Sequence, residues 1–391
     1  KYENNKKISQ TKIRAQTLFM DLLKERAETG RIYIMNIDHC NTHSSFKDKV
    51  YMSNLCQEIT LPTKPVQHID DPDGEIALCI LSAINLGLIK EKDELEELCD
   101  LSVRALDEII DYQEYPVEAA KKSTEARRSL GVGYIGLAHY LAKNKVKYNN
   151  QEAWKLVDEI TEAFQYYLLK ASNQLAQEKG KCDYFDRTKY ADGILPIDTY
   201  KKDLDSIIKR KLSYDWNTLR QDIKSSGLRH STLSAQMPSE SSSVVSNATN
   251  GVEPPRDYLS VKKSKKGTLK QIVPDYNRLK NFYTLLWDMP SNEGYINVIS
   301  VMQKYFDQAI SGNWSYNPEN YKDGEVPVST MANDLLMTYK LGWKTSYYQN
   351  TYDAKADIEE PTHTLGWHDN VKEEPKEIIL DDQEECEACA I

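Results

Sequence analysis

The stretch IALCILSAINLGLI, residues 76–89, is the apolar run that indicates the fold class most directly. The turn residues Asp73 and Gly74 precede it, and Lys90 follows it. An apolar run between such signals is typical of a buried β-strand and its exit from the sheet. The run therefore predicts a buried strand over these residues.

Helical and β-rich patterns alternate on both sides of this run. Apolar residues recur at helical spacing over 8–28 and over 151–180, where Trp154, Phe164 and Leu168 share one stripe. Further helices are predicted at 92–112, 116–128, 292–311 and 329–340, short helices within 197–226, and further strands at 31–38, 231–238 and 344–350. Strands that alternate with helices favour an α/β fold with largely parallel strands.

The composition is that of a globular protein. The chain has 391 residues, of which 40% are hydrophobic and 28% charged, enough for a sizeable core. Its net charge of −10 disfavours generic nucleic-acid binding. No stretch reads as a membrane span or a signal peptide, so we expect a cytoplasmic protein. Because the chain begins with Lys1 and not methionine, we expect a fragment, a processed piece or one part of a split protein.

The character of the sequence changes after residue 352. Residues 353–391 are acidic, broken by prolines and nearly unpatterned, which predicts a flexible tail behind one folded unit over 1–352. The tail ends in Cys386-x-x-Cys389. A mobile pair of this kind suits thiol–disulfide exchange. Half of a metal site is the alternative, and the absence of a second such pair in the sequence weakens it.

A second short stretch, SNLCQEITLP (53–62), places Asn54, Cys56 and Glu58 two residues apart. On a β-like backbone these three side chains would share one face, with Leu55 and Gln57 on the other. The stretch is either a buried cysteine with polar neighbours or a reaction centre. No histidine stands nearby to activate a nucleophile, and a carboxylate raises a thiol's pKa. One-electron chemistry at sulfur therefore fits better than nucleophilic attack.

Three further features are candidates for a role in binding or catalysis. Cys79 follows Cys56 by 23 residues and by itself is typical of a buried core cysteine. The serine-rich PSESSS (238–243) offers hydroxyls and amides that could bind phosphate, although an ordinary loop has the same composition. Tyr347 and Tyr348 suit a redox relay, because a phenol that loses an electron must also lose its proton. A lone tyrosine pair is otherwise a packing feature.

Other motifs are better explained by ordinary structural roles than by binding or catalysis. GVGYIG (131–136) lacks the preceding strand of a dinucleotide site, so its glycines are expected to start a helix or to allow close packing. DHCNTH (38–43) predicts a hydrogen-bonded loop, since a zinc site would need a second ligand pair. KKSKK (262–266) predicts a solvated turn. Cys99 and Cys182 are expected to be small core residues.

Taken together, the stretches with candidate catalytic residues resemble the large, catalytic subunit of class I ribonucleotide reductase, in particular the class Ia enzymes of enteric bacteria and their phages. The resemblance runs through nearly the whole chain, in the stretches TGRIYIMNIDHCNTHS, SNLCQEITLPTKP, GEIALCILSAINLG, LGVGYIG, YYLLKASNQLA, GILPIDTYKKDLD, MPSESSSVVSNATNGVEPPR and TSYYQN and in the cysteine tail. It implies the C-terminal part of a ten-stranded α/β barrel, built from two five-stranded halves with a finger loop through the centre.

The resemblance also implies roles for the residues of the finger. Cys56 would be the thiyl radical that removes the 3′-hydrogen of a ribonucleoside diphosphate. Glu58 would be the base for the 3′-hydroxyl, and Asn54 would hydrogen-bond the substrate. Cys79 would be one half of the dithiol that supplies two electrons, and its partner would lie in the missing N-terminal half. The same pocket would be lined by Asn54, Leu55, Cys56, Gln57 and Glu58 together with a diphosphate loop of Pro238, Ser239, Glu240, Ser241 and Ser242.

Partners follow from the same resemblance. Tyr347 and Tyr348 would deliver a radical from a separate small subunit that holds a diiron–tyrosyl cofactor, so this chain itself would bind no cofactor and no metal. Cys386 and Cys389 would re-reduce the active site and be reduced by thioredoxin or glutaredoxin. The family's subunit is roughly twice as long, so an N-terminal polypeptide would have to complete the barrel. An inactive fragment that binds the small subunit, or a thiol–disulfide protein using the tail pair, are the competing hypotheses.

Overall fold

The computed structural model describes residues 5, 7–69, 71, 73–264 and 267–353. At its centre, β2 (Ile80–Asn85) pairs in parallel with β3 (Leu130–Ile135), from Ile80 opposite Leu130 to Asn85 opposite Ile135. The predicted strand in 76–89 is thus confirmed, with the 3₁₀-helix η1 (Leu86–Leu88) as its exit. The prediction that it is buried is wrong on one face, because Leu81 is 42% exposed.

The parallel arrangement continues beyond β3 through two extended segments. Ser234 bridges Val132 of β3 in parallel, and Gln236 bridges Ile310 in parallel. The Tyr347 amide then donates to the Gly312 carbonyl, and β6 (Trp314–Tyr316) pairs in parallel with β8 (Gln349–Thr351). Antiparallel pairing of β1 (Ile34–Met35) with β7 (Thr345–Ser346) ends the array. The described residues therefore form an open, largely parallel series of strands.

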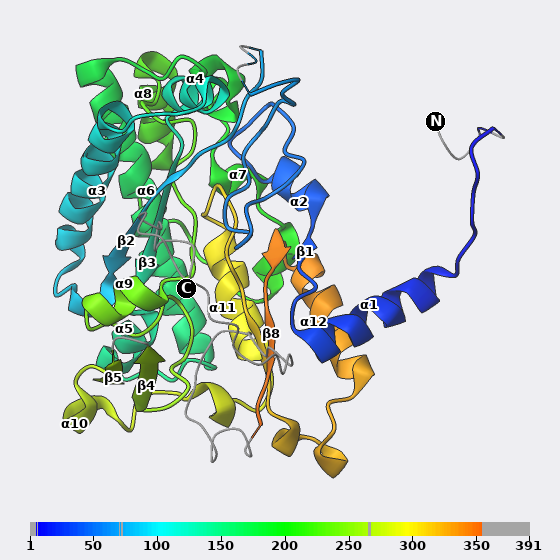
Figure 1. The fold of residues 1–391 in the computed structure, drawn as a ribbon. Helices are drawn as coiled ribbons and strands as arrows, with labels where there is room; N and C mark the ends of the chain where they lie inside the picture. The colour runs from blue at the N-terminus through cyan, green and yellow to red at the C-terminus, as the bar shows by residue number, and fades with distance from the viewer. Residues whose placement is uncertain (1–4, 6, 70, 72, 265–266, 354–391) are drawn as a thin grey trace, which may run out of the picture.

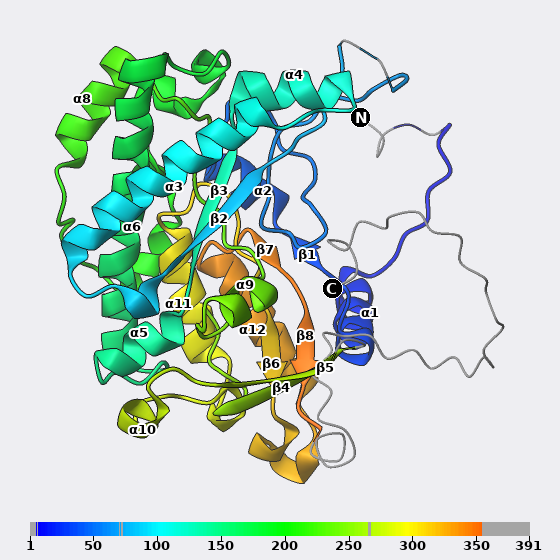
Figure 2. The ribbon, with the colours of Figure 1, turned by 60° about the vertical axis from the view of Figure 1, so that its left-hand side comes forward.

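Helices pack along this series of strands (Figures 1 and 2). The crossover from β2 to β3 runs through α3 (Lys92–Tyr112) and α4 (Glu118–Arg127), and α3 packs against the long α6 (Gln151–Lys179). The apolar stripe of α6 enters the main core, where Phe164 stacks on Phe306 at 5.7 Å between ring centroids. Burial of such faces, and not helix propensity alone, holds the helices in place.

The other elements are smaller or more peripheral. The remaining α-helices are α1 (Ala15–Thr29), α2 (Ile37–Thr42), α5 (Leu137–Lys143), α7 (Pro196–Thr199), α8 (Trp216–Ser226), α9 (Glu240–Val245), α10 (Tyr276–Leu279), α11 (Glu293–Gln303) and α12 (Val328–Lys340). The 3₁₀-helices are η2 (Phe185–Arg187), η3 (Lys189–Asp192), η4 (Lys202–Ser206), η5 (Leu286–Asp288), η6 (Pro318–Asn320) and η7 (Lys322–Gly324). A hairpin of β4 (Leu259–Ser264) and β5 (Gly267–Ile272) lies at the bottom of Figure 1. No helix in the described part of the chain has the length and apolarity to cross a membrane.

Several element boundaries differ from the sequence predictions. The helix predicted at 8–28 begins only at Ala15, and the strand predicted at 31–38 shrinks to β1 because α2 begins at Ile37. The helix predicted at 292–311 ends at Gln303, since residues 307–311 are extended beside 234–236. The hairpin of β4 and β5 was not predicted, and residues 262–264 of the basic run that was predicted as a turn belong to strand β4.

GVGYIG forms strand β3, which the sequence prediction missed. Glycine is required here by close packing: a Cβ on Gly131 would lie 2.5 Å from Leu81 Cδ2, and one on Gly133 would lie 2.7 Å from the Ala235 carbonyl oxygen. Gly136, at a φ of +76°, starts α5, as the prediction of a helix start required. Gly131 and Gly133 thus let β3 approach its neighbours on both sides.

DHCNTH folds mainly into α2 and is not the loop that was predicted. The expected hydrogen bonds to the protein are present: His39 Nδ1 lies 2.8 Å from the Trp343 carbonyl, and His43 Nε2 lies 2.6 Å from the Gln303 carbonyl. Cys99 and Cys182 are buried core residues, as predicted. Among the described residues, no group of three or more histidine, cysteine, aspartate or glutamate side chains is arranged to hold a metal ion.

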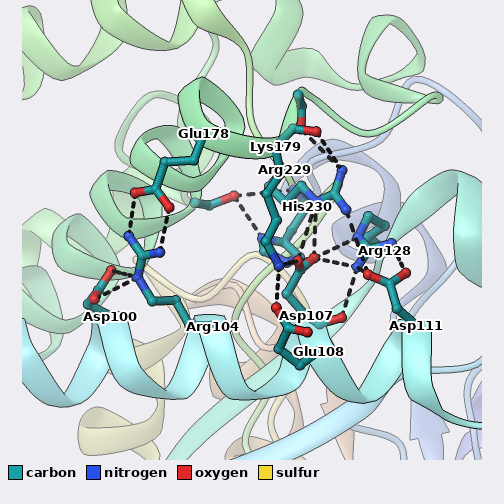
Figure 3. A network of polar contacts seen from close by, with 12 residues as sticks. Asp100, Arg104, Asp107, Glu108, Asp111, Arg128, Glu178, Lys179, Arg229 and His230 are labelled. Carbon is teal, nitrogen blue, oxygen red and sulfur yellow. Dashed lines mark hydrogen bonds and ion pairs between the residues drawn. The ribbon is translucent and has the colours of Figure 1, made fainter.

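A buried charge network ties α3 to the strands (Figure 3). The fully buried Asp107 accepts from Arg128 Nε at 2.6 Å and Arg229 Nε at 3.1 Å, and it lies 3.2 Å from His230 Nε2. Arg128 precedes β3, and His230 precedes the extended segment beside it. Burial opposes ionisation of Asp107, but the hydrogen bond from His230 and the two guanidinium charges outweigh it and lower its pKa. The carboxylate therefore fixes where two central strands begin.

Replacing Asp107 with asparagine is expected to lower the free energy of unfolding by about 3–5 kcal/mol, because Arg128 and Arg229 would lose a buried counter-charge. Asp100→Asn is the matched control on the same helix. Asp100 pairs with the partly exposed Arg104, and exposed pairs contribute about 0–1 kcal/mol. Urea unfolding of both variants measures the difference. Equal effects of the two substitutions would contradict the role given to the network.

Candidate active site

The finger segment 53–60 is a tight turn and not an extended strand. The Gln57 amide donates to the Asn54 carbonyl at 3.1 Å, and Gln57 has a φ of +66°. The Asn54 side chain closes the turn by accepting from the Ile59 amide at 3.0 Å. The predicted alternation is therefore wrong: Gln57 and Glu58 are both buried, while Leu55 is 76% exposed. The turn, and not strand periodicity, brings the polar groups together.

Hydrogen bonds to segment 307–311 hold the finger in place. The Ala309 amide donates to the Glu58 carbonyl at 2.9 Å, and the Thr60 amide donates to Gln308 Oε1 at 3.3 Å. Because this segment also bridges Gln236, it connects the finger to the strand that leads into the serine-rich segment. The backbone thus places the tip of the finger beside the 238–243 region.

Cys56 is partly buried at the tip and contacts a tyrosine. The Tyr347 hydroxyl donates to Cys56 Sγ at 3.3 Å. Burial raises the pKa of the Cys56 thiol, and the charge of Glu58 raises it further, while the Tyr347 hydrogen bond opposes both. The thiol therefore keeps its proton at neutral pH. That state suits hydrogen-atom exchange at sulfur and disfavours a thiolate nucleophile.

Glu58 is a buried carboxyl with two polar neighbours. Burial raises its pKa, and hydrogen bonds from Asn54 and Ser311 lower it in part. Ser311 Oγ lies 3.1 Å from Glu58 Oε2. A carboxyl in this setting is suited to accept a proton from a neighbouring hydroxyl. The predicted pair of Asn54 and Glu58 is thus brought together, whereas the sequence had given no sign of Ser311.

Cys79 lies immediately before β2, on the same side as the finger. Gln308 Nε2 donates to Cys79 Sγ at 3.6 Å and to the Leu130 carbonyl at 2.9 Å. Burial raises the pKa of Cys79 to about 12, and the charge of Glu58 contributes to the shift. Cys79 is a free thiol here. Gln308, which the sequence did not single out, links this thiol to the finger.

Three tyrosines form a cluster next to Cys56. The rings of Tyr347 and Tyr348 lie 4.3 Å apart between centroids, and Tyr33 lies 4.7 Å from Tyr347 and 5.1 Å from Tyr348. Burial raises the pKa of both Tyr33 and Tyr347, so the phenols are protonated at neutral pH. Tyr33 was missed because it lies just before β1, where no spacing in the sequence relates it to the distant tyrosine pair.

A cavity of about 270 Å³ opens beside the finger. The residues of the site that line it are Leu55, Cys56, Pro238, Ser239, Glu240, Ser243, Ser311, Tyr347 and Tyr348. Of the predicted substrate-binding residues, Asn54, Gln57, Glu58, Ser241 and Ser242 are not part of this lining. The serine-rich turn is also in part a helix, since α9 begins at Glu240. The cavity therefore joins the cysteine, the tyrosines and the start of the serine-rich segment.

Residues 1–349 match the family model described as ribonucleotide reductase, barrel domain. The chain belongs to this family. The α/β barrel domain expected from the sequence is thereby confirmed, and the open parallel series of strands described above is the part of the ribonucleotide reductase barrel that this chain contains.

Curated ribonucleotide reductase sequences share a high identity with the chain. The ribonucleoside-diphosphate reductase subunit alpha of Haemophilus influenzae is 58% identical over 363 residues, which is 92% of this chain and 48% of the relative. The ribonucleoside-diphosphate reductase 1 subunit alpha of Escherichia coli is 55% identical over 363 residues, which again is 92% of this chain and 48% of the relative. The subunit alpha of phage T4 is 42% identical over 370 residues. The chain thus spans about half the length of the curated relatives it matches.

Within this ribonucleotide reductase domain, most of the predicted site residues converge. Asn54, Cys56, Glu58, Cys79 and Tyr347 are connected through shared neighbours, as the contacts above describe. Cys386 and Cys389 lie outside the described residues, so their predicted role as a redox tail stays a prediction, as does the boundary at residue 352.

Proposed function

We propose that this chain is the catalytic part of a ribonucleoside-diphosphate reductase, which converts ribonucleoside diphosphates to 2′-deoxyribonucleoside diphosphates through a thiyl radical. The observation that carries the proposal is the 3.3 Å contact between the Tyr347 hydroxyl and Cys56 Sγ at the edge of a cavity. When the phenol has lost its hydrogen atom to a radical partner, this contact lets the hydrogen atom of the thiol pass to the phenolic oxygen and leaves the radical on sulfur. Family membership supports the same reading.

In the first step, the Cys56 sulfur radical takes the 3′-hydrogen atom of the substrate. The C–H bond breaks, an S–H bond forms and the unpaired electron moves to C3′. Glu58 accepts the proton of the 3′-hydroxyl, because it is a buried carboxyl whose pKa burial raises above its ordinary value. Asn54 hydrogen-bonds the substrate and holds it against the finger.

In the second step, the 2′-hydroxyl leaves as water and two electrons reduce the ribose. Cys79 and a second thiol supply these two electrons and two protons, and a disulfide forms between them. Glu58 gives its proton back to the 3′-oxygen, and Cys56 returns its hydrogen atom to C3′, which regenerates the sulfur radical. The sum is substrate plus dithiol to deoxy product, water and disulfide. The hydrogen bond from Gln308 to Cys79 supports this role by holding the thiol next to the finger.

The diphosphate would lie against the serine-rich segment. Ser239 lines the cavity with Pro238 and Glu240, on the strand-to-helix connection that follows Gln236. Hydroxyl and amide groups at such a connection are suited to phosphate oxygens. Ser241 and Ser242 are on the exposed side of α9 and would contribute through the backbone of the helix rather than through the cavity lining.

Two further protein partners belong to the proposal. A small subunit with a diiron–tyrosyl cofactor would supply the radical, and Tyr348 and Tyr347 would carry it to Cys56. Contact between the two rings at 4.3 Å supports a short relay. Thioredoxin or glutaredoxin would reduce Cys386 and Cys389, which in turn would reduce the active-site disulfide. The protein would act in the cytoplasm.

An N-terminal polypeptide is the remaining proposed partner. The chain covers 48% of the Haemophilus influenzae relative, and β2 has an exposed apolar side at the end of the strand series. The exposed apolar residues are Leu81 at 42%, on β2, and Leu78 at 38% and Ile76 at 37%, just before the strand. Open strand edges and apolar surface of this kind need a covering partner. The missing half of the barrel would cover them and would carry the partner thiol of Cys79.

Reconstitution tests this proposal. The chain alone is expected to form no deoxyribonucleoside diphosphate, and a mixture with the N-terminal half of a relative and a small subunit is expected to form it. Leu81→Asp should prevent this complementation, because it places a charge on the covered face. Leu101→Asp on the outer face of α3 is the matched control and should not, since Leu101 is 53% exposed. Turnover by the chain alone would contradict the proposal.

A further inference from the structure

Ser311 lies where three segments of the candidate active site meet. Its amide donates to the Gln236 carbonyl at 2.9 Å, on the strand that leads to the serine-rich segment. Its neighbours Ala309 and Gly312 bond the backbones of Glu58 and Tyr347. The Ser311 side chain also lines the cavity. The residue is therefore held by the three parts of the site that the proposed reaction uses.

The hydroxyl of Ser311 has two acceptors and one hydrogen. Ser311 Oγ lies 2.5 Å from the Cys56 carbonyl oxygen and 3.1 Å from Glu58 Oε2. A serine hydroxyl donates one hydrogen and accepts through its lone pairs. It can therefore donate its hydrogen to the Cys56 carbonyl or to the Glu58 carboxylate, but not to both at the same time.

The charge on Glu58 decides which acceptor is favoured. An ionised carboxylate is the stronger acceptor, so it attracts the hydroxyl hydrogen of Ser311. Once Glu58 holds a proton, it can itself donate to Ser311 Oγ, and the serine hydrogen is then free to turn to the Cys56 carbonyl. The arrangement links the proton on Glu58 to a hydrogen bond on the backbone of the radical-bearing residue.

We propose that Ser311 is a positioning residue whose hydroxyl turns between Glu58 and the Cys56 carbonyl as Glu58 gains and loses the proton of the substrate. The inference rests on the proposed function and adds to it a residue that acts through both the base and the finger. No bond to Ser311 forms or breaks: the proton moves from the 3′-hydroxyl to Glu58, and the serine O–H only reorients. Ser311 thereby keeps the carboxylate ionised before the step and supports the fingertip after it.

The surroundings of Glu58 make this coupling measurable. The titratable groups that face it are the thiols of Cys56 and Cys79, and Tyr347 lies beyond Cys56. Burial raises the pKa of both thiols and of Tyr347, so all three remain neutral on the acid side of neutrality. Asp307, on the same segment as Ser311, instead accepts from the Leu233 and Ser234 amides. Glu253, a second carboxyl of the cavity whose pKa burial raises, accepts from Asn313 Nδ2. A shift of the acid limb that follows substitution of Ser311 therefore reports Glu58, which Ser311 contacts.

The test compares Ser311→Ala with Ser311→Thr in the reconstituted complex. Glu58 must be ionised to accept a proton, so kcat/KM falls as pH drops through its pKa. Loss of the Ser311 donor raises that pKa, and the acid limb of kcat/KM should move up by about one pH unit in Ser311→Ala. Ser311→Thr keeps the hydroxyl and should restore the limb. Ser315→Ala, on strand β6 of the same chain segment, is the matched control and should not move it.

The outcomes separate the inference from the proposed function. A fall in kcat for Ser311→Ala with an unmoved acid limb would mean that Ser311 only supports the structure, and it would overturn the inference. If Ser311→Ala does not fold, Ser311→Cys, whose thiol is a weaker donor of similar size, should shift the limb in the same direction by less. An unmoved limb in that variant overturns the inference equally. Failure of the unsubstituted complex to turn over would instead reject the proposed function.

Discussion

Replacing Cys56 with serine is expected to abolish deoxyribonucleotide formation by the reconstituted complex, with a loss of at least about 1000-fold, or about 4 kcal/mol in the barrier. The O–H bond of serine is much stronger than the S–H bond of cysteine, so the serine oxygen cannot carry the radical from Tyr347. Serine is close to cysteine in size, and Cys56 is only partly buried at the tip of the finger. Initial rates of product formation measure the effect.

Two controls accompany this variant. The thermal midpoint of Cys56→Ser should match that of the parent chain, which shows that the loss is chemical. Cys99→Ala changes a fully buried cysteine that faces the Phe164 carbonyl, far from the finger in the α3–α6 interface, and should retain turnover. Substantial activity in Cys56→Ser would refute the assignment of the radical to this sulfur.

Replacing Tyr347 with phenylalanine is expected to have an effect of similar size, about 1000-fold. Phenylalanine can fill the space between Tyr33, Tyr348 and Cys56, but it lacks the hydroxyl that donates to Cys56 Sγ at 3.3 Å. Without the phenolic oxygen, residue 347 can neither hold the radical nor take the hydrogen atom from Cys56 Sγ. The measurement is again the rate of product formation in the reconstituted complex.

Tyr339→Phe provides the matched control for the relay. Tyr339 also loses a hydrogen-bonded hydroxyl, which donates to Asp38 Oδ2 at 2.6 Å, but it lies on α12 outside the tyrosine cluster. That variant should keep its turnover. Normal activity of Tyr347→Phe would show that the radical reaches Cys56 by a route other than this tyrosine.

Sequence patterns sufficed for the elements with strong periodicity. The long apolar stripe of α6 and the helices α3 and α12 lie where the spacing predicts them, because buried faces of helices impose a period of 3.6 residues. The residue types of the finger also favour one-electron chemistry at sulfur, on which the proposed function builds. These features are local in sequence, so a single chain displays them.

Features that depend on distant segments were not predictable in this way. GVGYIG forms a strand although its glycines disfavour one, since Leu81 and Ala235 leave no room for side chains on either side. The finger is a turn because segment 307–311 holds it, and that segment is about 250 residues away in sequence. Tyr33 and Ser311 lie in the site only because segments that are distant in sequence pack together there. None of these contacts leaves a periodic signal.

The central claim is that Cys56 removes the 3′-hydrogen of the substrate, and competition between unlabelled and 3′-deuterated ribonucleoside diphosphate tests it most directly. The isotope effect on kcat/KM is best measured in the reconstituted complex on the acid limb of its pH profile, where protonation of Glu58 slows the chemical step. The account predicts an isotope effect clearly above 1, because the C3′–H bond breaks in that step. An isotope effect of 1 under these conditions would contradict it.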